Sequence, residues 1–114
     1  MFLGQYSNQL KSSNHIQLPA EWRSLISGGI YLTRGFDQNL LIFTADTFKE
    51  IYARISSLNI ADPLARLLLR MLLGMASFVD INENESIPVP PSLLEYADLK
   101  SQVVIIGQGE YLEV

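Results

Sequence analysis

Cysteine is absent from this 114-residue chain, and histidine occurs only once. Without cysteine there are no disulfides, no thiolate nucleophile and no cysteine-ligated zinc. The single histidine, His15, lies in a polar turn with no acidic residue at helical spacing, so no metal-ligand cluster is evident around it. Glycine pairs occur at 28–29, where a short helix ends, and at 107 and 109, in a hairpin; neither opens a helix as a phosphate-binding loop does. We therefore expect no metal, no cofactor and no enzymatic activity.

Positive charge is also scarce, since eight lysines and arginines stand against twelve acidic residues, for a net charge of −4. Neutralising nucleic-acid phosphates requires lysine and arginine, so the composition argues against a broadly basic binding surface. Any contact with DNA must then depend on a few local residues.

Long apolar runs are missing as well. No segment approaches the ~18 uninterrupted apolar residues of a membrane helix; residues 67–78 come closest, and Arg70 and Gly74 interrupt them. Residues 1–6 lack the basic region and apolar segment of a signal peptide. We expect a cytoplasmic protein that does not enter a membrane.

Apolar residues are nevertheless plentiful, at 48% of the chain, and only 18% of residues are charged. A monomer of this length cannot bury so large an apolar fraction in its own core. The composition therefore predicts that another subunit covers part of the apolar surface.

Two segments of the sequence resemble each other. Residues 16–23 (IQLPAEWR) are echoed 71 positions later by residues 87–94 (IPVPPSLL). In both, an alternating apolar pair leads into a proline, and a short helix follows. One such unit cannot bury its own apolar face, so we expect both to share one core. The predicted fold is α+β: two pseudo-symmetric β-rich repeats, 1–45 and 76–114, form one barrel-like core and are joined by two connecting helices in 46–75.

The local patterns place the elements within each predicted repeat. Alternating apolar residues and turn residues indicate strands, and proline followed by helix-forming residues indicates short helices. The expected strands are 2–10, 16–18, 30–33, 40–43, 76–81, 87–89, 103–106 and 111–114, and the expected short helices are 20–26 and 91–97.

The first connecting helix begins after Thr44, whose hydroxyl suits an N-cap. Its apolar residues recur at intervals of three and four, which is typical of an amphipathic helix. They are Phe48, Ile51, Tyr52, Ile55 and Leu58.

The second connecting helix covers 64–73, with Asp62 as N-cap and Pro63 at its first position. Apolar side chains occupy nearly its whole circumference, and Arg66 and Arg70 form a single polar stripe. Such a helix is buried on more than one side. We therefore predict an interface between copies of the chain, formed by Leu64, Leu67, Leu68, Met71 and Leu72.

Several segments together resemble the MraZ family over essentially the whole chain. They are MFLGQY (1–6), IQLP (16–19), the helix with Arg66 and Arg70, AS (76–77), IPVPP (87–91), EYADL (95–99) and VVIIG (103–107). The resemblance implies a bacterial transcriptional regulator of the cell-division and cell-wall gene cluster. It also implies tandem AbrB-like swapped-hairpin repeats, a ring-shaped homo-oligomer, association with the nucleoid, and promoter reading through an Asp-x-x-x-Arg motif in each repeat.

The chain departs from the family at these motifs. In the first repeat the motif aspartate falls on Lys11 and the arginine on His15; in the second they fall on Asn82 and Ser86. Neither replacement offers the charged fork with which arginine binds guanine or phosphate. The resemblance implies DNA-binding positions at Lys11, Ser12, Ser13, Asn14, His15, Asn82, Glu83, Asn84, Glu85 and Ser86, to which the nearby Arg23 is added.

Three interpretations stay open. The protein is a regulator whose DNA recognition is weakened or shifted toward Lys11, His15 and Arg23. Alternatively, it has lost DNA binding and serves as a protein-interaction or assembly module. As a third possibility, it is an enzyme on a related fold, for which the sequence offers no catalytic constellation.

Overall fold

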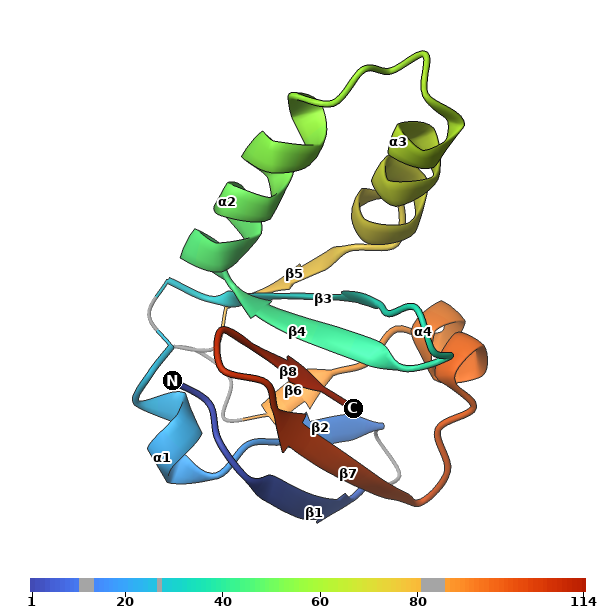
Figure 1. Ribbon diagram of the computed structural model, residues 1–114. Coiled ribbons are helices and arrows are strands. Elements are labelled where there is room, and N and C mark those ends of the chain that lie inside the picture. The colour runs from blue at the N-terminus through green and yellow to red at the C-terminus, as the bar shows by residue number, and fades with distance from the viewer. Residues whose placement is uncertain (11–13, 27, 81–85) are drawn as a thin grey trace.

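The computed structural model describes residues 1–10, 14–26, 28–80 and 86–114. They form a mixed fold in which a six-stranded antiparallel sheet and a two-stranded ribbon are accompanied by helices (Figure 1). The strands are β1 (Gln5–Gln9), β2 (His15–Gln17), β3 (Ile30–Arg34), β4 (Leu40–Thr44), β5 (Ser77–Val79), β6 (Ser86–Pro88), β7 (Gln102–Gly107) and β8 (Tyr111–Glu113). The helices are α1 (Ala20–Arg23), α2 (Ala45–Ser56), α3 (Pro63–Leu68), the π-helix η1 (Leu69–Leu73) and α4 (Pro91–Ala97).

The large sheet has the strand order β1-β7-β8-β4-β3-β5. Strands from the two ends of the chain are interleaved in it: β1 pairs with β7, β3 with β5, and β4 with β8, all antiparallel. The smaller ribbon likewise joins the distant strands β2 and β6. Because β1, β2 and β4 each pair with a strand from the C-terminal part of the chain, the two ends fold together.

In the part of the chain that the structure describes, the large sheet is open and not closed into the barrel-like core that we expected. Its edge strands are β1 and β5, and among the described residues no ladder joins them. β5 has only three residues, so it offers little backbone for closure. Side chains of the β2–β6 ribbon and of helices α1 and α4 pack into the core beside the sheet.

One apolar cluster contains residues from both ends of the chain. Ile16 and Ile87 of the ribbon, Ile105 of β7 and Leu112 of β8 are all fully buried in it. Trp22 of α1 is also buried there. The expectation of one shared interior is therefore met, although the sheet around it is open.

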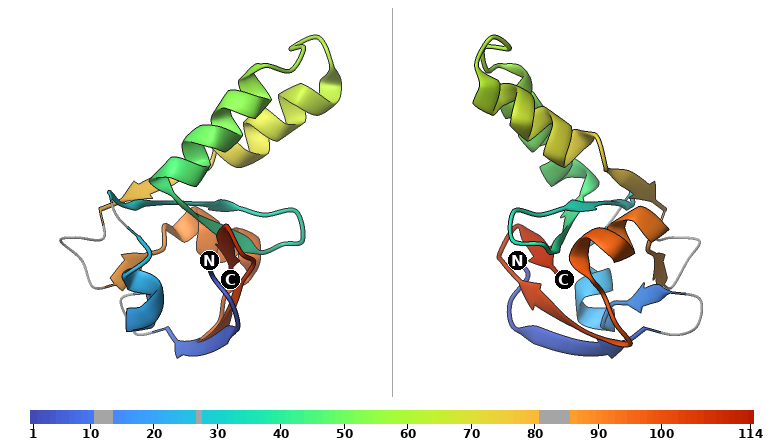
Figure 2. Two further views of the ribbon diagram at one scale, coloured as in Figure 1. Left: turned by 60° about the vertical axis from the view of Figure 1, so that its left-hand side comes forward. Right: turned by 90° about the vertical axis from the view of Figure 1, so that its right-hand side faces the viewer.

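A second apolar cluster lies between the sheet and a helical arm formed by α2, α3 and η1, which projects from the sheet (Figure 2). The predicted caps begin both helices: Thr44 Oγ1 accepts a hydrogen bond from the Thr47 amide at 3.2 Å, and Asp62 Oδ1 accepts one from the Leu64 amide at 2.9 Å. The cluster contains Leu41, Phe43, Phe48, Ile55 and Leu72.

The end of the arm differs from the regular helix that we expected over 64–73. Residues 69–73 adopt the wider π-helical turn, η1. Thr33 of β3 is fully buried beneath it, and its hydroxyl donates to the Leu72 carbonyl at 2.8 Å. This bond fixes the arm to the sheet.

The expectation that this second helix is buried on more than one side is wrong for the single chain. Its inner face packs on the second cluster, but Leu64 is 59% exposed and Leu67 is 46% exposed. Within the described ranges, no helix is both long and apolar enough to cross a membrane.

Candidate nucleic-acid interface

The β2–β6 ribbon brings two of the predicted DNA-binding positions onto one surface. Ile16 lies directly opposite Ile87, and both are fully buried. Side chains alternate along a strand, and opposed residues of an antiparallel pair point the same way. The other four residues of the ribbon therefore point outward, and none of them is buried: His15 opposite Pro88, and Gln17 opposite Ser86.

The ribbon also holds these two predicted positions apart. His15 is the first residue of β2, and Ser86 is the first residue of β6. Since His15 pairs with Pro88 and Ser86 pairs with Gln17, these two residues occupy diagonal corners of the same outer face. A ligand that contacts both residues must run across the ribbon.

Asn14 has the left-handed backbone conformation, with φ of 56°. Asparagine is among the few residues other than glycine that adopt this conformation readily. The Asn14 carbonyl accepts a hydrogen bond from the Val89 amide at 3.1 Å, which extends the contact between β2 and the segment after β6. Asparagine thus suits the backbone conformation that this position requires.

Asn8 of β1 positions the ribbon, a role that sequence reasoning missed. Its side-chain amide donates to the Gln17 carbonyl at 3.1 Å, and its Oδ1 accepts from the Gln17 amide at 3.5 Å. A side chain that makes both bonds replaces a neighbouring strand at that edge of β2. The sequence shows only that Asn8 is a polar residue in a predicted strand. That pattern does not reveal that its side chain bonds to a residue nine positions away.

The remaining predicted positions are distributed differently. Arg23 is in the last turn of α1, not on the ribbon; it is half-buried, and its Nε is buried without an acceptor among the described residues. The other seven predicted positions lie outside the described residues: Lys11, Ser12, Ser13, Asn82, Glu83, Asn84 and Glu85.

The described outer face of the ribbon is polar and carries no carboxylate. His15, Gln17 and Ser86 offer hydrogen-bonding groups, which can contact phosphate oxygens or the edges of bases. Counterion release by fixed positive charge, the main source of DNA affinity, is not provided by these three side chains. Geometrically the surface can contact DNA, but electrostatically it is weak.

The structure also places the five residues of the predicted interface between copies. Leu64 and Leu67 of α3 are exposed, and Leu68 and Met71 are half-buried. Leu72 is buried in the second apolar cluster of its own chain, so it is not accessible to a partner. An interface at this arm would involve mainly Leu64 and Leu67.

Comparison with known proteins identifies the family. Residues 1–71 match the family model described as "MraZ protein, putative antitoxin-like". The chain belongs to the MraZ family.

Individual relatives match along the whole chain. A protein named transcriptional regulator MraZ from Herpetosiphon aurantiacus is 37% identical over 114 residues, which are all of this chain and 80% of the relative. Proteins of the same name from Thermomicrobium roseum and Dictyoglomus thermophilum are 32% and 35% identical over the same 114 residues, and these cover 80% and 78% of the two relatives. The likeness therefore extends through both β-rich ends and the helical arm.

Proposed function

We propose that this protein is a sequence-specific DNA-binding transcriptional regulator of the MraZ type that acts on the bacterial cell-division and cell-wall gene cluster. Its relatives are named transcriptional regulators. The observation that carries the proposal is the pairing of Ile16 with Ile87, because it directs His15 and Ser86, the two motif-arginine positions, to one outer face. We expect the working form to be a ring-shaped homo-oligomer associated with the nucleoid.

The proposal includes two AbrB-like repeats, 1–45 and 76–114, around the arm at 46–75. The register between β4 and β8 supports this division. Leu41 pairs with Glu113, and Ile42 pairs with Leu112. The 71-residue offset of the sequence repeat relates Leu41 to Leu112 and Ile42 to Glu113. Applied to both strands, this offset therefore turns one of the two pairs into the other. Such a register is what a pseudo-twofold relation between the two repeats requires.

Each DNA contact is weak on its own in this proposal. In the first repeat Lys11 supplies a charge and His15 a hydrogen-bond donor, with Arg23 nearby on α1. In the second repeat Ser86 makes a neutral contact, and Glu83 and Glu85 repel phosphate. A ring that presents many such turns to tandem promoter repeats would add weak contacts into a useful affinity.

Binding to a promoter fragment with tandem repeats tests the proposal when it is titrated at several salt concentrations. We expect binding at low salt that weakens as salt rises, with a slope of about 0.9 on logarithmic axes for each phosphate neutralised. Lys11→Glu should weaken binding and reduce the slope. Lys100→Glu is the matched control, since Lys100 is exposed and pairs with Asp98 at 3.0 Å. No binding at low salt, or a slope near zero, would overturn DNA binding.

The negative charge of the chain favours a second candidate function, that of an assembly or protein-interaction module that does not bind DNA. The net charge of −4 and the carboxylates of Glu83 and Glu85 favour it. In that case Lys11→Glu and His15→Ala leave function intact, whereas disruption of the helix over 64–73 abolishes it. The opposite pattern would exclude this alternative.

A further inference from the structure

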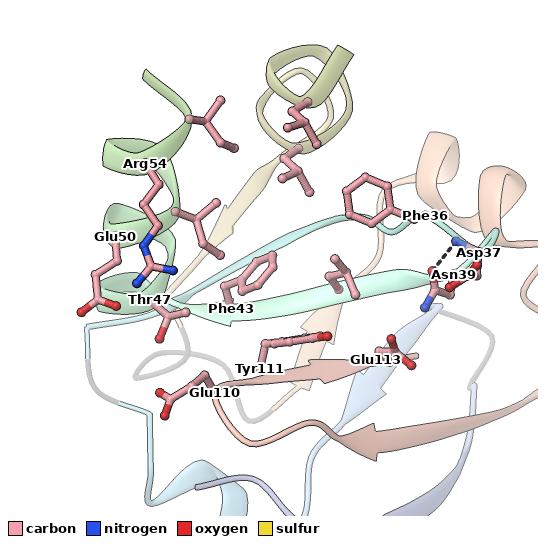
Figure 3. A pocket seen from close by; sticks show the side chains of 15 residues that line it. Phe36, Asp37, Asn39, Phe43, Thr47, Glu50, Arg54, Glu110, Tyr111 and Glu113 are labelled. Atoms are coloured by element: carbon pink, nitrogen blue, oxygen red, sulfur yellow. Dashed lines mark hydrogen bonds between the residues drawn. The ribbon is translucent and has the colours of Figure 1, made fainter. Parts of the chain in front are cut away.

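A groove of about 580 Å³ lies between the helical arm and the sheet. Its floor is apolar and comes from β4, β8 and the inner faces of α2, α3 and η1, as Figure 3 shows from close by. Leu41, Phe43, Ile51, Ile55, Leu68, Leu72 and Tyr111 contribute to it. An apolar hollow of this kind on a small chain is typical of a binding surface.

The rim of the groove is acidic. Four carboxylates line it, those of Asp37, Glu50, Glu110 and Glu113, and Arg54 is the one basic residue among its described lining. Figure 3 shows Glu50 and Arg54 on α2 on one side and Glu110 beside β8 below them. The groove therefore suits an apolar ridge flanked by positive charge.

The outer face of the same arm has these properties. Leu64 and Leu67 of α3 are exposed, and neither lines the groove. Arg66 and Arg70 are exposed and lie on the same turns of helix, with Arg70 three residues after Leu67. The Arg66 guanidinium donates to the carbonyls of Ile60 and Ala61 at 3.0 and 3.1 Å, which fixes this side chain against the segment that precedes α3. The chain thus carries both an acidic apolar groove and a basic apolar ridge.

We propose that the ridge of one copy, Leu64 and Leu67 with Arg66 and Arg70, docks in the groove of the next copy. This inference rests on the self-association in the proposed function, and it names the two surfaces that meet. Burial of the leucines against the floor supplies the apolar contribution, and the two guanidinium groups face carboxylates of the rim. A lone chain exposes both surfaces, and association covers both.

The ridge and the groove are different surfaces on one chain. A contact between unlike surfaces leaves each end of a growing assembly with one free ridge or one free groove, so further copies add until the arrangement closes. A contact of this kind is compatible with the ring in the proposed function, which forms when the rotation from copy to copy closes. It also leaves the β2–β6 ribbon outside the contact, since no described ribbon residue lines the groove.

Two variants, each with one damaged surface, test the contact. Leu67→Asp places a charge on the ridge and leaves the groove intact. Glu50→Lys combined with Glu110→Lys reverses two charges on the rim and leaves the ridge intact; both positions are exposed. We expect each variant alone to associate about tenfold to a hundredfold more weakly than the parent in sedimentation velocity.

The decisive measurement is a mixture of the two variants. The intact ridge of one fits the intact groove of the other, so we expect a species of two chains and no larger assembly. Matched controls are Leu25→Asp, at a leucine that is 47% exposed on the segment after α1, and Glu21→Lys with Glu95→Lys, which reverse two exposed charges away from the groove. Both controls should assemble like the parent, and circular dichroism should show all variants folded.

Other outcomes overturn the inference in distinguishable ways. If the rim variant alone assembles normally, the groove is not the receiving surface; if Leu67→Asp assembles normally, the ridge is not the docked one. A parent that remains monomeric overturns both this contact and the proposed self-association. Loss of DNA binding with assembly intact would overturn only the DNA-binding part of the proposed function.

Discussion

Removal of one buried hydroxyl should loosen the helical arm from the sheet. The side chain of Thr33 is 0% exposed, and its hydroxyl donates to the Leu72 carbonyl at 2.8 Å, with the Met71 carbonyl at 3.4 Å. These carbonyls belong to the last turn of η1, where backbone acceptors lack partners within the helix. Thr33→Val keeps the shape of the side chain and removes the donor.

The expected cost follows from the acceptor that is left behind. A buried carbonyl deprived of its donor costs about 1–3 kcal/mol, whereas a well-packed apolar replacement recovers part of this. We expect a net loss of ~1.4 kcal/mol, which is about tenfold in the equilibrium for opening of the arm. Thr33→Ser is the matched variant, because it keeps the donor and loses a methyl group worth about 0.8 kcal/mol.

Hydrogen exchange at a fixed protein concentration separates the two variants. In Thr33→Val the amides of 69–76 should exchange about tenfold faster, with smaller changes in the sheet. In Thr33→Ser the stability of the whole protein should fall slightly while these amides keep their relative protection. Equal exchange in the two variants, or no change in Thr33→Val, would refute the view that this hydroxyl holds the arm.

Two further predictions concern the ribbon. Asn14→Val should destabilise the protein by about 1–2 kcal/mol, because a β-branched residue resists the left-handed conformation, whereas Asn14→Gly should be close to neutral; thermal unfolding measures both. His15→Arg with Ser86→Arg should strengthen binding to tandem-repeat DNA and steepen its salt slope by about 0.9 for each additional phosphate that is neutralised. Gln108→Arg with Ser92→Arg is the control, because it adds the same charge at exposed positions off the ribbon. This control pair should not strengthen DNA binding as much. An equal increase in affinity from the two pairs would contradict a specific role for the ribbon.

Local patterns predicted the start of each element of the arm well. Thr44 and Asp62 cap the helices as expected, and α4 has the predicted limits, 91–97. These features depend on residues a few positions apart, so their energetics can be read locally. Ends were less predictable: the expected helix over 20–26 stops at Arg23, and the strand expected over 2–10 is β1 at Gln5–Gln9. The packing around an element decides where it ends.

The candidate site could be predicted only in part. The resemblance drew attention to His15 and Ser86, and the alternation around Ile16 and Ile87 indicated which residues point inward. It did not indicate that these two strands pair with each other, nor that Asn8 bonds to the free edge of β2. Pairing between residues 71 positions apart depends on the whole core, which no local window contains.

The amino-acid sequence by itself determined the types of local structure, the scarcity of positive charge and the departure from both family motifs. Tertiary structure alone decided that strands from opposite ends of the chain interleave in an open sheet, and that Leu72 is buried while Leu64 and Leu67 remain exposed. The physical reason is that hydrogen-bond periodicity and capping act over a few residues, whereas burial depends on which distant surfaces meet. The helical segment over 63–73 has apolar residues on nearly its whole circumference. Only the contacts of the folded chain therefore decide which of its faces is buried.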